Sequence, residues 1–92
     1  MGLASPEEVR KFIADNPVWK LDGQTLVAEF IFKNFNESMG FVTRVALSAE
    51  RAGHHPHIDI RWNRVRLVLS THSEGGITGK DFDLAAHIAG FV

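Results

Sequence analysis

The stretch that most constrains the fold lies between positions 57 and 70, where apolar and polar side chains alternate with a period of two. The alternation is interrupted once, at Asn63-Arg64, a pair that suits a tight turn. The apolar members are Ile58, Ile60 and Trp62 before the turn and Val65, Leu67 and Leu69 after it. Only a strand places every second side chain on one face. The pattern therefore predicts a β-hairpin whose apolar face, Trp62 included, packs in the core.

A second hairpin is predicted upstream. Val18 to Leu21 alternates over a short distance, Asp22-Gly23 is a favourable turn pair, and period-two alternation resumes after it. The positions expected to face the core are Leu26, Ala28, Phe30 and Phe32. Val27 and Ile31 fall on the opposite face, where they are either scattered surface residues or part of a contact between subunits.

Capping residues mark the starts of two helices. Ser5, Pro6 and Glu8 are typical of a helix that begins at residue 6, and the proline at position 17 ends that helix by restricting the residue before it. Thr78 with Asp81 three residues later predicts another start. The helix that follows should run nearly to residue 92.

A longer helix is predicted between the two hairpins. Asn36 can cap its start, and Gly53 suits a left-handed residue at its end. Its apolar stripe consists of Met39, Val42, Val45, Ala46 and Ala49, and Phe41 and Leu47 widen the apolar surface. Such a stripe indicates a helix face that packs on the core.

The order of elements is then helix, two strands, helix, two strands, helix. Blocks of this kind joined by tight turns favour an α+β fold, a two-layer sandwich of a four-stranded antiparallel sheet with three helices on one face. With 92 residues and 45% hydrophobic content, the chain is expected to form one domain, residues 1–92, around one core. Its thin margin of burial makes oligomerisation a natural supplement.

Composition excludes several functions. The chain has no cysteine, which removes disulfides, thiolate nucleophiles and cysteine-ligated zinc. Its net charge of -1 gives no overall attraction to nucleic acid or to an anionic membrane, and the arginines at 61, 64 and 66 are read as a solvated turn. No apolar run is long enough to cross a membrane, and the N-terminus lacks the pattern of a secretory signal. A cytoplasmic protein is expected.

Polar residues with chemical potential gather between positions 50 and 81. His54 and His55 follow the end of the long helix, whose dipole favours a cationic imidazole, and Glu50 stands one turn earlier. His72 comes from the end of a different strand, and the fold can bring it to the same pocket. Together these residues suit general acid–base chemistry.

Each of these residues also has a simpler interpretation. Asp81 is a helix cap on local grounds, Glu50 and His72 suit solvated surface positions, and the parity of Trp62 favours core packing over a ligand-facing wall. His57 and His87 are assigned no task. A zinc site is weakly indicated, because adjacent histidines rarely share one ion and no HExxH spacing occurs.

Taken jointly, the spacing is more specific. Glu50, three residues, His54-His55-Pro56, five residues, Trp62, nine residues, His72, eight residues and Asp81 resembles the active-site signature of the pterin-4a-carbinolamine dehydratase family. The segments AERAGHHP, VRLVLSTHSEGGIT and DFDLAAHI are also similar to that family. The resemblance covers essentially the whole chain.

The resemblance implies a lyase that removes water from a 4a-hydroxytetrahydropterin, left by an aromatic amino acid hydroxylase, to give quinonoid dihydropterin. By matching positions it implies that His54 and His72 are the acid and base and that His55 positions the pterin. It implies substrate-binding roles for Glu50, Pro56, Trp62, Thr71 and Asp81. No metal and no organic cofactor are required.

The resemblance also implies partners and an alternative. Family members are commonly homodimers or homotetramers, and functional coupling to a hydroxylase is possible for such an enzyme. Some relatives instead act as non-catalytic pterin- or molybdopterin-binding proteins, or as dimerisation partners of a transcription factor. A retained pocket alone does not prove turnover, but an intact set of histidines favours the enzyme.

Overall fold

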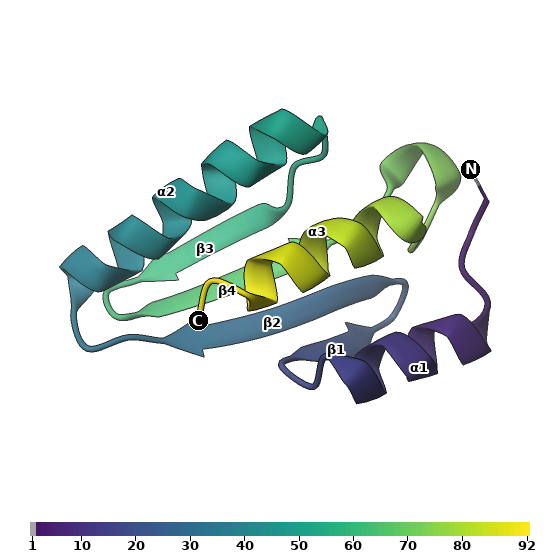
Figure 1. The fold of residues 1–92 in the computed structure, drawn as a ribbon, viewed down its shortest axis with the longest axis horizontal. Coiled ribbons are helices and arrows are strands. Elements are labelled where there is room, and N and C mark those ends of the chain that lie inside the picture. The colour runs from purple at the N-terminus through teal and green to yellow at the C-terminus, as the bar shows by residue number, and fades with distance from the viewer. Residues whose placement is uncertain (1) are drawn as a thin grey trace.

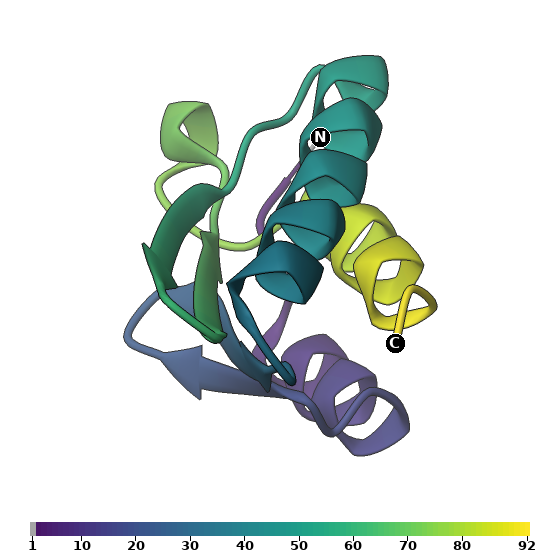
Figure 2. The ribbon, with the colours of Figure 1, turned by 90° about the vertical axis from the view of Figure 1, so that its left-hand side faces the viewer.

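The computed structural model describes residues 2–92 and shows a four-stranded antiparallel sheet with three helices on one face (Figures 1 and 2). The elements are α1 (Pro6–Asp15), β1 (Trp19–Asp22), β2 (Thr25–Ile31), α2 (Phe35–Ala52), β3 (His57–Arg61), β4 (Arg64–Leu69), the short 3-10 helix η1 (His72–Glu74) and α3 (Gly79–Ala89). The predicted fold class and order of helices and strands are confirmed, with η1 as an addition. Within residues 2–92, none of the helices combines the length and the apolar character needed to cross a membrane.

The sheet has the strand order β1-β2-β4-β3, so β2 and β4 are central and β1 and β3 form its edges. The central pairing sets Leu26 opposite Leu69, Ala28 opposite Leu67 and Phe30 opposite Val65. All six side chains are buried, as the period-two pattern predicted. Val27 is half-buried, and Ile31 is exposed on the face that no helix covers.

Two side chains of the predicted apolar face depart from that pattern: Ile58, on the edge strand β3, is exposed, and the larger departure is Trp62. Its side chain is 68% exposed, so the prediction that it packs in the core is wrong. The reason is the register of the hairpin. Arg61 pairs with Arg64, so the turn consists of Trp62 and Asn63. The sequence had predicted Trp62 as the last strand residue and Asn63-Arg64 as the turn. The backbone of Trp62 has φ = 54°, a left-handed conformation that side chains with a Cβ rarely adopt.

The other tryptophan joins the two layers. Trp19 on β1 is fully buried, and its indole Nε1–H donates to the carbonyl oxygen of Ala85 on α3 at 3.0 Å. Its ring meets that of Phe30 edge to face, with the centroids 6.5 Å apart. A buried tryptophan needs a partner for its N–H, and this bond fixes the third helix against an edge strand.

Helix α2 packs on the sheet through a stripe that shares Val45 and Ala49 with the predicted one but differs from it elsewhere. Ser38, Phe41, Val45 and Ala49 are buried, whereas Met39 and Ala46 are exposed. Phe41 decides the rotation of the helix, because its ring packs on Phe30 with the centroids 4.7 Å apart. The predicted cap is also displaced: Asn34, not Asn36, accepts the Glu37 N–H at 2.9 Å.

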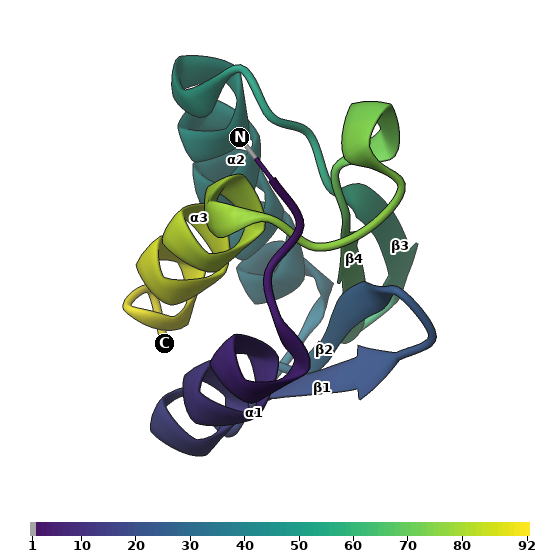
Figure 3. The same ribbon diagram turned by 90° about the vertical axis from the view of Figure 1, so that its right-hand side faces the viewer.

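Two connections meet at one end of the sheet, where β3 begins and β4 ends (Figures 1 and 3). The C-terminus of α2 turns at Gly53, which has the predicted left-handed conformation. After β4, a bridge between Thr71 and Gly76 closes the loop that contains η1. The N-terminus of α3 follows directly, with the predicted capping box between Thr78 and Asp81. This end carries most of the residues in the signature.

Candidate active site

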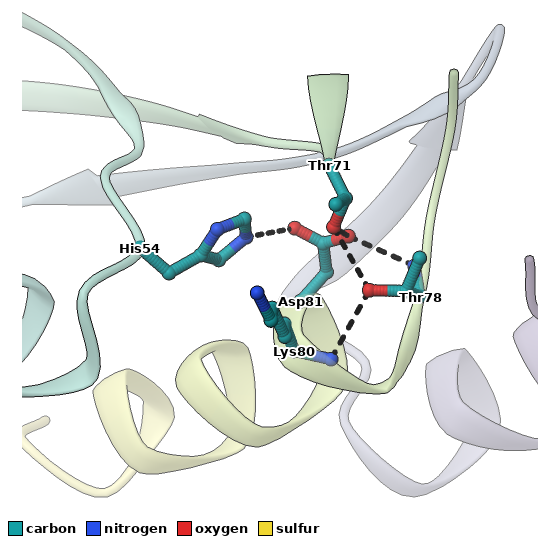
Figure 4. Close-up of polar contacts among 5 residues, drawn as sticks. All are labelled: His54, Thr71, Thr78, Lys80 and Asp81. Atoms are coloured by element: carbon teal, nitrogen blue, oxygen red, sulfur yellow. Dashed lines mark hydrogen bonds and ion pairs between the residues drawn. The ribbon is translucent and has the colours of Figure 1, made fainter. Parts of the chain in front are cut away.

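A buried carboxylate organises this end of the molecule. Asp81 lies in the first turn of α3 and has no solvent exposure. Its Oδ1 atom is 2.5 Å from Nε2 of His54, which lies just after α2 (Figure 4). The His54 side chain is 11% exposed, so the pair is almost removed from water. A buried carboxylate is tolerated only when hydrogen-bonded or paired, and His54 provides one such partner.

The second oxygen of Asp81 has partners of its own. Oδ2 accepts the Thr71 hydroxyl at 2.8 Å and the Thr78 backbone N–H at 2.9 Å. The Thr71 and Thr78 hydroxyl oxygens are 2.8 Å apart. Because Thr71 donates its only hydroxyl proton to Asp81, the Thr78 hydroxyl must donate to Thr71. Thr78 in turn accepts the Lys80 backbone N–H at 3.2 Å.

The Thr71 hydroxyl and the Thr78 backbone N–H both donate to Asp81, so the carboxylate is the acceptor at the centre of this network. With Asp81 as the acceptor, the tautomer assigned to His54 carries its proton on Nε2, and in the neutral ring Nδ1 then carries the free lone pair. Within residues 2–92, Nδ1 of His54 makes no protein hydrogen bond. That nitrogen can accept a proton, and the carboxylate then stabilises the cationic ring that results.

Three of the other four histidines form two exposed pairs, and the fourth, His87, lies on α3 against Phe91. Nε2 of His55 lies 2.9 Å from Oε1 of Glu50, with side-chain exposures of 65% and 82%. His72, in η1, lies near His57, their ring centroids being 5.9 Å apart. Pro56 lies between His55 and His57 and is half-buried. One partly buried imidazole and three exposed ones therefore occupy the same end of the sheet.

The structure thus brings together all the signature residues but one. Direct contacts join His54, Thr71 and Asp81 on one side and Glu50 and His55 on the other. Trp62 lies at the opposite end of the β3–β4 hairpin, separated from His57 by the length of β3. Five strand residues span roughly 15 Å. Within one chain, Trp62 therefore forms no part of this cluster.

Some functional neighbours were missed in the sequence. Thr78 was predicted only as a cap, yet its hydroxyl orients Thr71. His57 was assigned no task, although its pairing with Val68 on β4 places it at the strand end that leads to His72. The register of the β3–β4 hairpin could have revealed that His57 lies near His72. No sequence pattern revealed the contact between Thr78 and Thr71.

A groove with a volume of about 600 Å³ runs between α2 and α3 and reaches His54. The part of the chain that the structure describes contains no group of three or more histidine, aspartate or glutamate side chains placed to hold a metal ion. The groove and the polar cluster meet at His54.

The fold and the site define a small α+β protein with a carboxylate-anchored histidine beside a helix-lined groove. The family model described as pterin 4 alpha carbinolamine dehydratase matches residues 3–91. The chain belongs to this family. The resemblance stated from the sequence is confirmed.

Two bacterial relatives match over nearly the full length. A protein of Chloroflexus aurantiacus is 52% identical over 88 residues, which cover 96% of this chain and 95% of that protein. One of Acidobacterium capsulatum is 48% identical over 88 residues and 96% of each chain. Both carry pterin-4-alpha-carbinolamine dehydratase as a provisional name.

Solved structures share the fold. A crystal structure from Brucella melitensis, described as a transcriptional coactivator/pterin dehydratase, superposes with a TM-score of 0.92 at 32% identity and covers 97% of each chain. A pterin dehydratase-like RuBisCO assembly factor of the alpha-carboxysome has a TM-score of 0.64 at 20% identity, covering 78% of this chain and 83% of that one. The second likeness concerns the fold alone.

Proposed function

We propose that this protein is a lyase that dehydrates a pterin-4a-carbinolamine to quinonoid dihydropterin by histidine acid–base catalysis. The observation that carries the proposal is the buried Asp81–His54 pair, at the positions where the family signature has an acid and a histidine. A histidine exposed on the surface would not need a buried carboxylate to hold its ring in one orientation. Family membership and the two named relatives support the same reaction class.

The proposed reaction is a proton exchange. The hydroxyl on C4a takes a proton and leaves as water, while a ring nitrogen loses a proton and forms the new double bond to C4a. Of His54 and His72, one donates the first proton and the other accepts the second, so the pair is restored when the two imidazoles exchange a proton with solvent. Asp81 supports His54 in its cationic form and holds its Nδ1 toward the substrate.

The remaining residues are assigned to binding. His55, held by Glu50, would position the polar edge of the pterin, and Thr71 and Pro56 would border it. No metal or organic cofactor takes part in the proposed reaction, since both proton transfers are within the reach of imidazoles. A cytoplasmic location, homo-oligomerisation and service to an aromatic amino acid hydroxylase in pterin recycling belong to the same proposal.

The test is the dehydration rate of freshly generated 4a-carbinolamine, followed by ultraviolet absorbance with and without the purified protein. We expect acceleration, and a loss of about a hundredfold in His54→Ala and in His72→Ala, as is usual for general acid–base groups. Lys20→Ala, a change on the opposite edge strand, is the control. Wild-type rates in both histidine variants would refute the assignment.

A non-catalytic role is the second candidate, because the Brucella melitensis structure is described as a coactivator as well as a dehydratase. Pterin binding without acceleration by the folded protein would favour it. In that case the exposed pairs Glu50–His55 and His57–His72 would serve only to bind the pterin. His72→Ala would then change the affinity for pterin without changing any dehydration rate.

A further inference from the structure

The groove between α2 and α3 has properties that the dehydration reaction does not use. The two helices run antiparallel, so the C-terminal half of α2 faces the N-terminal half of α3 (Figures 1 and 3). Arg44 and Arg51 line the groove from α2, two turns apart, and Lys80 lines it from α3. Its volume of about 600 Å³ falls within the range of small-molecule sites, roughly 300–1,000 Å³.

The charge of the groove differs from that of the whole molecule. Three cations, Arg44, Arg51 and Lys80, share it with one anion, Asp83, which gives +3 − 1 = +2 against a net charge of -1 for the chain. The five ion pairs found in residues 2–92 involve none of these four side chains. Cations gathered in a cleft with apolar walls attract anions more strongly than scattered surface cations do.

The walls of the groove suit a ligand that is not only charged. Leu84 lies buried along it, and Leu47, on the last turns of α2, is 68% exposed at its rim. A large exposed apolar side chain beside unpaired cations is typical of a site for a ligand with an apolar or planar body and an anionic group. Inorganic ions alone would leave these apolar walls without a contact.

The groove is continuous with the catalytic cluster. His54 lines it together with Lys80 and Arg51. Figure 4 shows the Lys80 side chain on the side of Asp81 where His54 lies, with Thr71 and Thr78 on the other side. The Lys80 backbone is fixed by its hydrogen bond to Thr78. A ligand whose anionic group is held by Lys80 and Arg51 can therefore place the rest of its body against the His54 ring.

We propose that this groove binds the anionic tail of the substrate, so that the preferred pterin carries a carboxylate or a phosphate on its side chain instead of a neutral hydroxyalkyl group. The inference rests on the proposed function for the identity of the ring. Arg51 and Lys80 hold the anion near His54, and Arg44 extends the site toward a longer tail. Leu47 and Leu84 contact the linking atoms.

The experiment compares the affinities of three oxidised pterins by isothermal titration calorimetry. They share the ring and differ in the side chain: a neutral dihydroxypropyl group, a carboxylate-bearing group and a phosphate ester of the hydroxyalkyl group. We expect the acidic pterins to bind about tenfold or more tightly than the neutral one, with the difference reduced by salt. The carboxylate and phosphate arms identify which anion is preferred.

Variants locate the preference. Arg51→Gln and Lys80→Gln should each weaken binding of the acidic pterins by about three- to tenfold and leave the neutral pterin unchanged. Arg61→Gln, on the sheet face away from the helices, is the matched control and should change neither. Equal affinities for neutral and acidic pterins, or an unchanged preference in both variants, would overturn the inference while leaving the dehydratase intact.

A fourth arm separates the two proposals. Inorganic pyrophosphate, which has no pterin ring, is titrated into the same four proteins. Pyrophosphate binding that is lost in Arg51→Gln and Lys80→Gln, with no pterin bound by any of the four, would show an anion site but would contradict both the dehydratase and the assignment of this site to a substrate tail. If neither pyrophosphate nor any pterin binds the folded protein, the anionic-tail site is refuted together with the function.

Discussion

At the residue scale, the Asp81 carboxylate both caps helix α3 and binds residues of the candidate site. It completes the capping box of α3 through the Thr78 backbone N–H, and it receives the Thr71 hydroxyl and the His54 imidazole. The local interpretation as a cap and the interpretation as a site residue are therefore compatible. The helix start places the carboxylate, and the carboxylate places the histidine.

Asp81→Asn separates shape from charge. The asparagine side chain keeps the volume but turns one oxygen into an NH₂ group, which would face either the His54 N–H or the donors on Thr71 and Thr78. We expect a loss of about 1–3 kcal/mol in the free energy of unfolding, measured by urea denaturation. The dehydration rate constant kcat should fall by at least about tenfold, because His54 loses the charge that stabilises its cation.

Asp15→Asn is the control for this substitution, since Asp15 is an exposed carboxylate at the end of α1. It should change neither stability nor rate. Thr71→Ser adds a second reference, because it retains the hydroxyl that donates to Asp81. Full activity in Asp81→Asn would show that the carboxylate is a cap and nothing more.

At the scale of elements, α2 has one glycine at its C-terminal cap, which the fold requires, and one in its interior, which it does not. Gly53 ends the helix with φ = 63°, and this turn directs His54 toward Asp81. Gly40 lies inside the helix and is exposed, and nothing lies within 4 Å of the position that a Cβ would occupy. The two positions therefore respond oppositely to the same substitution.

We expect Gly40→Ala to stabilise the protein by about 0.5–1 kcal/mol, because alanine restricts the unfolded chain and favours helix. Gly53→Ala should destabilise it by about 1–2 kcal/mol, since the left-handed conformation is costly for a residue with a Cβ. Thermal and urea unfolding measure both changes. Destabilisation by Gly40→Ala would mean that α2 tolerates no added methyl group on its exposed side.

The elements also show which parts of the sequence were informative. Period-two alternation predicted the inward faces of β2 and β4, and the capping boxes located the starts of α1 and α3 within a residue, because these signals are local. The rotation of α2 was not predictable in this way. It depends on Phe41 meeting Phe30 across the core, a contact that no local pattern contains.

The same distinction holds for the site. The spacing of the signature singled out His54, His72 and Asp81, but the hydrogen bonds that join Asp81 to Thr71 and Thr78 depend on where β4 ends relative to α3. The prediction that Trp62 packs in the core was wrong for a related reason. Its parity with Ile60 holds only if β3 continues through it, and the register of the hairpin ends the strand one residue earlier.

At the scale of the whole molecule, Trp62 and the candidate site around His54 and Asp81 occupy opposite ends of the sheet. If each chain works alone, Trp62→Ala should leave the dehydration rate within about twofold of the wild-type value, because β3 lies between them. The rate is measured at several protein concentrations, with size-exclusion chromatography alongside. A large fall with the fold intact would mean that a neighbouring copy supplies this indole.

Two long-range hydrogen bonds join the beginning of the chain to its end. The Ala4 N–H donates to the Ile77 carbonyl at 2.8 Å, and Trp19 donates to Ala85. During synthesis, neither acceptor exists until most of the chain has been made, so the first helix and strand wait without their final partners. The two acceptors, Ile77 and Ala85, bracket the segment that contains Thr78 and Asp81. The proposed site is therefore completed last. A nascent chain that stops before α3 contains the three histidines of the proposal but lacks the carboxylate that anchors His54.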